Sequence, residues 1–150
     1  MISALFPAGK GNPGPFQRQA RRLGVGARLK FWGPQDDLSP FYQAATVLAL
    51  PTIYDPCSNV VLEALACGAP VITTNANGAA EFLTPGENGE ILTRPDDLTG
   101  LTRALEDYLG RGAAPEVRRA AAAGVAHLSW ETTVAQTLAV LEEAGSASKI

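Results

Sequence analysis

The stretch "TVLALPTIYDPCSNVVLEALACGAPVITT", residues 46–74, decides the fold class. It begins with a continuous apolar run over 46–51 and ends with a second one over 70–74. Between them, residues 58–67 form a predicted helix that stops at Gly68, a residue type favoured just past a helix end. Two apolar strands joined by a helix indicate parallel strands in a sheet that is covered on both faces.

The rest of the chain repeats this alternation of short strands and helices. Further strands are predicted over residues 2–6, 28–33 and 89–92. Further helices are predicted over residues 16–23, 39–45, 78–83, 96–109, 115–127 and 130–144. We therefore predict one α/β domain over residues 1–150, with a doubly wound, Rossmann-like parallel sheet.

The composition narrows the function classes. The 150 residues are 46% apolar, enough for one hydrophobic core, and the net charge of −3 gives no reason to expect a nucleic-acid partner. No apolar run of about 18 residues and no signal-peptide pattern is present, so a cytoplasmic location is expected. Cys57 and Cys67 lie about 15 Å apart at the ends of one predicted helix, too far for a disulfide. One histidine and no cysteine cluster predict no metal site.

The start of the helix at 58–67 is a predicted anion site. Ligands of doubly wound folds lie at the carboxyl ends of the strands, against helix N-termini. The first amides of this helix, those of Cys57, Ser58, Asn59 and Val60, have no partner within the helix. Together with the helix dipole they favour a phosphate group.

Two carboxylates bracket that helix start, Asp55 in the loop before it and Glu63 about two turns into it. Carboxylates repel a bare phosphate. They accept hydrogen bonds, however, from the hydroxyls of sugars attached on either side of a phosphate group. A nucleoside diphosphate sugar has this form, so Glu63 could take the ribose and Asp55 the hexose. The structural alternative is that Asp55 only favours the turn and the helix dipole. For Glu63 a structural role is less favoured, because a carboxylate on an apolar helix needs a partner.

Residues 55–72, "DPCSNVVLEALACGAPVI", resemble the donor-site signature of retaining glycosyltransferases of family 4, which have the GT-B fold. The shared pattern is an acid, seven residues and a glutamate, followed by Ala-x-Ala-x-Gly-x-Pro-Val. Glutamate is usual at the first acid, so Asp55 departs from the pattern and puts the sugar preference in doubt. Similar segments at 31–51, 77–83, 87–92 and 128–143 extend the resemblance over nearly the whole chain.

The resemblance implies a hexosyltransferase that moves a hexose from a nucleoside diphosphate sugar to an acceptor hydroxyl with retention. Glu63 would bind the ribose, and Asp55 would bind the transferred sugar as the catalytic residue. Residues 57–60 would hold the diphosphate and the adjacent sugar. The loop near the nucleobase would consist of Trp32, Gly33 and Pro34. No metal or other cofactor is implied, since preorganised amides and basic residues can stabilise a departing diphosphate.

The resemblance also implies parts that we do not find in these residues. An acceptor-binding domain and the first strand of the donor domain are expected to be absent, so that the chain alone is expected to be inactive. An N-terminal domain or another chain would complete it. A peripheral membrane acceptor, and membrane association through the absent domain, are left open. Since the absent strand is central in this fold, we expect strand 2–6 to pair with 46–51, a neighbouring chain to fill the gap, or low stability.

Two other functions remain as alternatives. The chain could be a nucleotide-sugar-binding fragment without turnover. It could also be a domain of a nucleotide-sugar epimerase, which has two such domains, although the spacing of the two acids suits transfer better. Binding of nucleoside diphosphates, followed by a transfer assay, would separate these functions.

Overall fold

The computed structural model describes residues 11–147. The chain divides into two compact units, Met1–Leu38 and Ser39–Ile150. The predicted strand over 2–6, and with it the expected pairing with 46–51, lies outside the described residues. Among the described residues, no helix combines the length and the apolar character needed to cross a bilayer.

The first unit contains the helix α1 (Gly14–Arg22) and the 3-10 turn η1 (Gly26–Arg28). α1 confirms the helix predicted over 16–23. The strand predicted over 28–33 is reduced to one residue: η1 occupies its beginning, and after it Leu29 alone forms a β-bridge, with extended backbone (φ −107°, ψ 121°). At the other end of that segment Gly33 has a φ of 67°, in the left-handed region, which is incompatible with an extended strand.

The second unit is built on three parallel strands, β1 (Leu48–Leu50), β2 (Val71–Thr74) and β3 (Gly89–Leu92). β2 lies in the middle and pairs with both neighbours, with Ala49 opposite Ile72 and Ile72 opposite Glu90. The expectation of a parallel α/β sheet is therefore confirmed.

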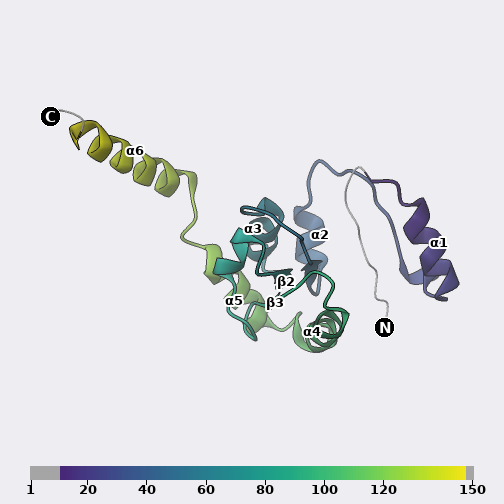
Figure 1. The fold of residues 1–150 in the computed structure, drawn as a ribbon. Helices are drawn as coiled ribbons and strands as arrows, with labels where there is room; N and C mark the ends of the chain where they lie inside the picture. Colours follow the sequence, from purple (N-terminus) through teal and green to yellow (C-terminus); the bar gives the residue numbers. More distant parts are fainter. Residues whose placement is uncertain (1–10, 148–150) are drawn as a thin grey trace. The chain divides into compact units, whose positions relative to one another are not determined.

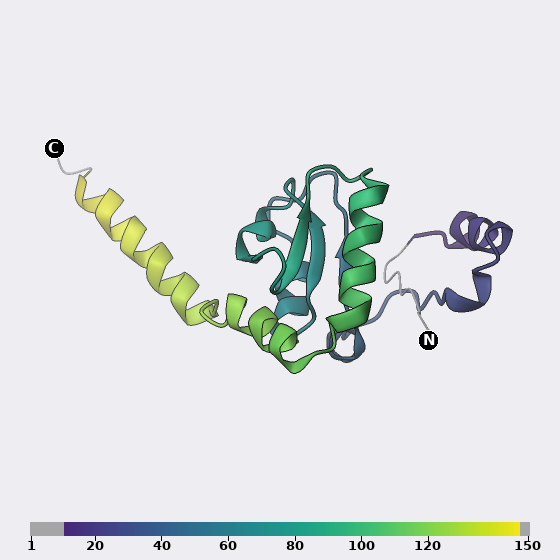
Figure 2. The same cartoon turned by 90° about the horizontal axis from the view of Figure 1, so that it is seen from below.

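Helices flank and follow these strands, and their positions are close to the predicted ones; the last of them, over 130–147, has only exposed side chains among its described residues and does not cover the sheet. The helices are α2 (Ser39–Ala44), α3 (Asn59–Ala66), η2 (Gly78–Phe82), α4 (Leu98–Arg111), α5 (Pro115–Val125) and α6 (Trp130–Ala147). η2 is a 3-10 helix rather than an α-helix. The strands lie between α3 on one side and α4 on the other, so both faces are covered (Figures 1 and 2).

The core under α4 is formed by side chains from the sheet and the helices that follow it. Ile72, Leu92, Ala104 and Tyr108 are buried there together with Val117. The Tyr108 hydroxyl donates a hydrogen bond of 2.9 Å to the carbonyl oxygen of β3's first residue, which satisfies its one buried polar atom. This side of the sheet is thus fixed by apolar burial, and the polar groups gather at the ends of the strands.

The C-terminal ends of α2 and α3 are held by one arginine of α5. Arg118 donates hydrogen bonds to the carbonyl oxygens of Gln43, Ala45 and Cys67, at 2.9, 3.1 and 3.2 Å. These carbonyls end their helices without intrahelical partners, so the guanidinium also complements both dipoles. Just beyond α3, Gly68 has a φ of 77°, as predicted for the residue that ends this helix.

Candidate functional site

The loop from β1 into α3 is ordered by Asp55. Its backbone N–H donates to Ala76 (3.1 Å), and its carbonyl oxygen accepts from the N–H of Gly78 (2.9 Å). These two bonds extend the parallel pairing of β1 and β2 past the strand ends. The Asp55 carboxylate accepts a hydrogen bond from the Cys57 N–H through Oδ1, at 3.1 Å. One of its oxygens therefore serves the turn, in agreement with the structural alternative.

Asn77, at the end of the neighbouring β2 loop, fixes the start of α3. Its side chain is 2% exposed and accepts hydrogen bonds from the N–H groups of Ser58 (3.3 Å) and Ala79 (3.1 Å). Its amide nitrogen donates to the Thr73 hydroxyl at 3.1 Å, which in turn donates to the carbonyl oxygen of Leu50 at 2.8 Å. One buried amide group thus ties together β1, β2, η2 and α3.

These contacts reduce the number of backbone N–H groups at the start of α3 that are available to a ligand. Among the four predicted donors, the N–H groups of Cys57 and Ser58 are already bonded within the protein. Val61 and the residues after it bond back into the first turn. The N–H groups of Asn59 and Val60 are left without a hydrogen-bond partner among residues 11–147. The Ser58 side chain, at the N-cap, makes no capping hydrogen bond. Two adjacent amides therefore remain for an anion.

Glu63 lies on the exposed side of α3 and has a partner that the sequence did not predict. The Tyr42 hydroxyl, from α2, donates to Glu63 Oε2 at 3.2 Å. Burial, and after it the negative charge of Glu63, raises the pKa of Tyr42 to about 12. Tyr42 therefore stays protonated and keeps donating over the whole physiological range. Glu63 is oriented by this bond, and its second oxygen can accept from a ligand.

The predicted nucleobase loop lies in the first unit. Trp32 is 41% exposed, and the ammonium of Lys30 sits 3.8 Å from the centre of its ring. Gln35 donates to the carbonyl oxygens of Trp32 and Pro34, at 3.0 and 2.9 Å, which shapes the turn around Gly33. The involvement of Trp32, Gly33 and Pro34 in binding a base stays a prediction.

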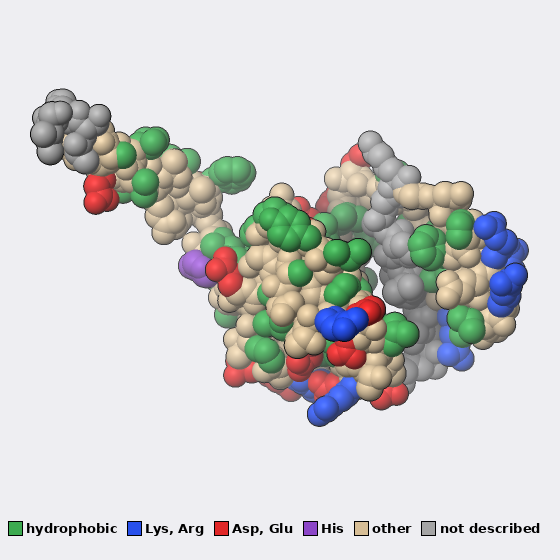
Figure 3. Space-filling view, viewed as in Figure 1, with side chains coloured by type: hydrophobic (Ala, Val, Ile, Leu, Met, Phe, Trp, Pro, Cys, Tyr) green, Lys and Arg blue, Asp and Glu red, His purple; other side chains and the backbone are tan. Residues whose placement is uncertain are grey.

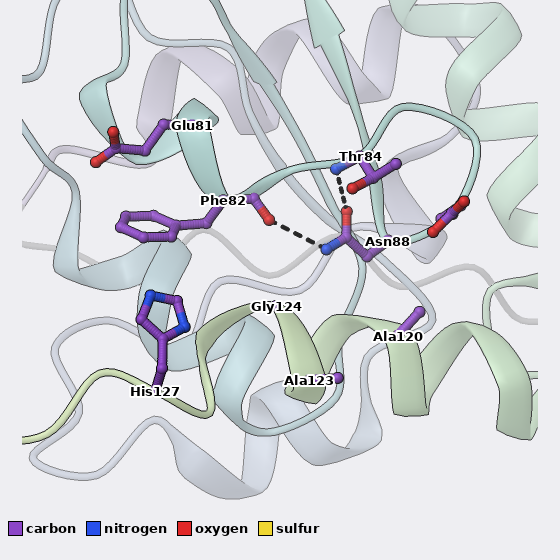
Figure 4. Close-up of a pocket in the computed structure, with 9 residues that line it drawn as sticks. Glu81, Phe82, Thr84, Asn88, Ala120, Ala123, Gly124 and His127 are labelled. Atoms are coloured by element: carbon purple, nitrogen blue, oxygen red, sulfur yellow. Dashed lines mark hydrogen bonds between the residues drawn. The ribbon is translucent and has the colours of Figure 1, made fainter.

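An open pocket of about 550 Å³ lies elsewhere in the second unit, between η2 with its following turn and α5. Phe82 and His127 form one wall, with ring centres 6.0 Å apart, and Glu81 lies at its edge (Figure 4). Asn88, 3% exposed, forms the inner side and is bonded to Thr84 N–H and Phe82 carbonyl oxygen. None of the predicted site residues lines this pocket, which makes it a separate feature.

Sequence reasoning found the two acids and the helix start but missed Asn77 and Tyr42. The signal for Asn77 was present, because an asparagine before Gly78 is a favoured N-cap of the following turn. Tyr42 gave no such signal, since it lies on a helix outside the motif, 21 residues before Glu63. Within the described residues, no group of three histidine, cysteine or acidic side chains could hold a metal ion. Both cysteines are free.

Comparison with known proteins adds to this geometry. The sequence model of the family described as Glycosyl transferases group 1 matches residues 4–111. The lipopolysaccharide core biosynthesis glycosyltransferase LpsE of Rhizobium meliloti is 40% identical over 90 residues, which cover 60% of this chain and 26% of that protein. The D-inositol 3-phosphate glycosyltransferase of Mycolicibacterium paratuberculosis is 34% identical over 149 residues, 93% of this chain and 33% of that protein. The chain thus spans about a quarter to a third of these relatives.

Solved structures share the fold. The sucrose-phosphate synthase of Thermosynechococcus elongatus superposes with a TM-score of 0.82 at 28% identity, covering 96% of this chain and 39% of that one. The Anabaena protein Alr3699/HepE, solved in complex with UDP, superposes with a TM-score of 0.71 at 24% identity. That match covers 90% of this chain and 40% of the other, and at this identity it bears on the fold alone.

Proposed function

The chain belongs to the glycosyl transferases group 1 family, and on this basis we propose that it binds a nucleoside diphosphate sugar as part of a retaining hexosyltransferase. The diphosphate would lie at the start of α3, with the hexose toward Asp55 and the ribose toward Glu63. Transfer would need an acceptor-binding region that the family resemblance assigns to residues other than these. The chain alone would then bind the donor without turning it over.

One observation carries this proposal. The N–H groups of Asn59 and Val60 are unbonded within the described residues, and acids with a remaining acceptor oxygen stand before and after them. An anion alone would be repelled by these acids. An anion esterified to hydroxyl-rich groups gains hydrogen bonds to the carboxylates that offset this repulsion.

In the proposed reaction these residues stabilise the leaving diphosphate and position the two sugars. Breaking the bond between the hexose and the diphosphate leaves negative charge on a phosphate oxygen. Fixed amide dipoles at a helix start stabilise that charge without having to reorient. Asp55, held by the Cys57 N–H at 3.1 Å, would position the hexose by accepting from its hydroxyls. Glu63, held by Tyr42, would do the same for the ribose.

Calorimetric titration tests the proposal. UDP is the first nucleotide to use, because Alr3699/HepE, which shares the fold, was solved with UDP. Glu63→Gln should weaken UDP binding about tenfold, the loss of one hydrogen bond to a charged group. Asp55→Asn should leave UDP binding unchanged or stronger, and should remove the extra affinity of UDP-glucose over UDP. Glu106→Gln, an exposed acid of α4, is the matched control and should change neither.

The outcomes separate the alternatives. No binding of UDP, ADP or GDP at millimolar concentration would contradict the proposal. Equal effects of the Asp55 and Glu63 substitutions on UDP and UDP-glucose would contradict the two separate roles. Turnover of a donor sugar by the chain alone would overturn the proposed need for an acceptor region, and an epimerised product would point to the epimerase.

A further inference from the structure

Tyr42 is a buried side chain whose hydroxyl ends at an exposed carboxylate. The residue is 6% exposed in α2, and its hydroxyl donates to Glu63 Oε2 on α3 at 3.2 Å. The other buried tyrosine, Tyr108, instead uses a backbone carbonyl oxygen, that of Gly89. Exposed Asp and Glu side chains occur at several places on the face of the second unit that Figure 3 shows, so exposure alone does not distinguish Glu63. Its distinguishing feature is the buried hydroxyl donor.

The Tyr42 hydroxyl is held in place by the fold rather than by the loop before α3. Arg118 of α5 donates to the carbonyl oxygens of Gln43 and Ala45, just after the tyrosine. It also donates to the Cys67 carbonyl oxygen, at the C-terminal end of α3. One guanidinium therefore ties the ends of α2 and α3 together, and Tyr42 cannot shift along α3 unless these bonds break.

The bond restricts a side chain that would otherwise be mobile. An exposed glutamate can adopt several rotamers, and it loses that freedom when a ligand orders it. No other hydrogen bond or ion pair among residues 11–147 reaches the Glu63 carboxylate. Helical side chains lean toward the helix N-terminus, so Glu63 lies over the turn that contains the unbonded N–H groups of Asn59 and Val60. The Tyr42 bond thus sets the direction of the carboxylate next to these amides.

A carboxylate held in this way presents both of its oxygens in a fixed geometry. Tyr42 occupies one lone pair of Oε2, which leaves the second lone pair of Oε2 and both lone pairs of Oε1. Two neighbouring oxygens can accept from the two hydroxyls of a vicinal diol at once. If one hydroxyl is missing, a fixed oxygen loses its partner, whereas a freely rotating carboxylate can turn toward water.

We propose that Tyr42 is a positioning residue: it holds the Glu63 carboxylate so that both oxygens accept from the 2′- and 3′-hydroxyls of a ribose, and so makes the α3 site select ribonucleotides over 2′-deoxyribonucleotides. This inference rests on the proposed function, in which Glu63 takes the ribose. Tyr42 touches no part of the ligand and acts through Glu63 alone. Its contribution is therefore visible in the ratio of the affinities for the two kinds of nucleotide.

Calorimetric titration of the full chain with UDP and 2′-deoxy-UDP tests this role. Wild type should bind UDP about tenfold more tightly than 2′-deoxy-UDP, the usual effect of one hydrogen bond to a charged group. Tyr42→Phe should lower the affinity for UDP about fivefold, so that the ratio falls to about three. The reason is that ordering the released carboxylate weakens both complexes, while its freedom to turn toward water offsets part of this loss for the deoxy sugar.

Tyr108→Phe is the matched control. It also removes the hydroxyl of a buried tyrosine in the second unit, together with a hydrogen bond of 2.9 Å, but its partner lies in β3 rather than α3. The affinity ratio of this variant should equal that of wild type. A double-mutant cycle adds a second test: in a Glu63→Ala background, Tyr42→Phe should no longer change the affinity for UDP. The ratio is insensitive to a partial loss of folded protein, because both nucleotides bind the same folded fraction.

Several results would overturn the inference. If wild type binds UDP but does not prefer it over 2′-deoxy-UDP, the selectivity is refuted while donor binding stands. If Tyr42→Phe keeps the wild-type ratio, or changes it no more than Tyr108→Phe does, Tyr42 has only a structural role. A further loss of UDP affinity in the Glu63→Ala background would show that Tyr42 does not act through Glu63. Binding of neither nucleotide by wild type would instead refute the proposed function, and this role with it.

Discussion

Replacing Asn77 by alanine should damage the α3 site and the stability of the second unit together. The side chain is buried, and the substitution removes its hydrogen bonds to the N–H groups of Ser58 and Ala79 and to the Thr73 hydroxyl. Each bond contributes about 1 kcal/mol, and leaving a buried donor unpaired costs about 1–3 kcal/mol. The free energy of unfolding should therefore fall by about 3–4 kcal/mol.

Urea unfolding measures this loss. A chain of this size has a slope of about 2 kcal/mol per molar urea, so the midpoint should drop by about 1.5–2 M at constant slope. Asn88→Ala is the matched control, since Asn88 is also buried and makes two hydrogen bonds, to Thr84 and Phe82. It should lower the midpoint by a comparable but smaller amount. In the absence of denaturant, Asn77→Ala should lose UDP binding, whereas Asn88→Ala should retain it.

Two results would refute this reasoning. If Asn77→Ala moves the midpoint by less than about 0.3 M, the amide network does not hold the loop ends, because three lost bonds must exceed that value. If Asn77→Ala and Asn88→Ala weaken UDP binding equally, the effect on the ligand follows from general destabilisation. The position of Asn77 at the start of α3 would then have no special role.

Three further predictions follow from single contacts. In Tyr42→Phe the free energy of unfolding should depend less on pH than in wild type. The pKa of Tyr42 is about 12 in the native protein and about 10 in the unfolded chain, so the free energy of unfolding of wild type should fall by up to about 2 kcal/mol as pH rises from 10 to 12. Urea unfolding of both proteins over this pH range measures the difference. Gly78→Ala should cost about 3 kcal/mol or more in the same assay, because an added Cβ would collide with the Pro56 carbonyl oxygen, whereas Gly110→Ala, in open space on α4, should stabilise by about 0.5–1 kcal/mol. Arg118→Met should lower the thermal midpoint by several degrees, since three hydrogen bonds to helix-ending carbonyls are lost; an unchanged midpoint would mean that water replaces them.

The parts of the fold that sequence predicted are those with strong local signals. The unit β1–α3–β2 has continuous apolar strands and a glycine that ends the helix, and the predicted bounds agree with the observed ones within two residues or so. The prediction over 28–33 holds only at Leu29, which forms a β-bridge, and the rest of the segment does not keep the extended conformation of a strand. η1 and the left-handed Gly33 turn the chain away from that conformation instead.

The candidate site was predictable in part for the same reason. Asp55 and Glu63 belong to one contiguous motif, so their spacing was visible in the sequence. The side chains that hold them, Asn77 and Tyr42, come from other elements and meet the motif only after the sheet has formed. The number of amides available to a ligand could not be predicted either, because it depends on which of them donate hydrogen bonds to side chains of the protein itself.

The distribution of hydrogen bonds indicates that the start of α3 contributes more to ligand specificity than to affinity for anions in general. A helix dipole supplies about half a positive charge, and the two remaining amides are those of Asn59 and Val60. Asp55 and Glu63 oppose that charge with two carboxylates, so an inorganic anion gains little there. A ligand gains only if hydroxyl groups reach both carboxylates while its phosphates reach the amides. Because Asn77 and Tyr42 already orient the surrounding groups, the proposed nucleotide sugar should lose little conformational entropy to the protein on binding, and the spacing of its sugars should set most of the selectivity.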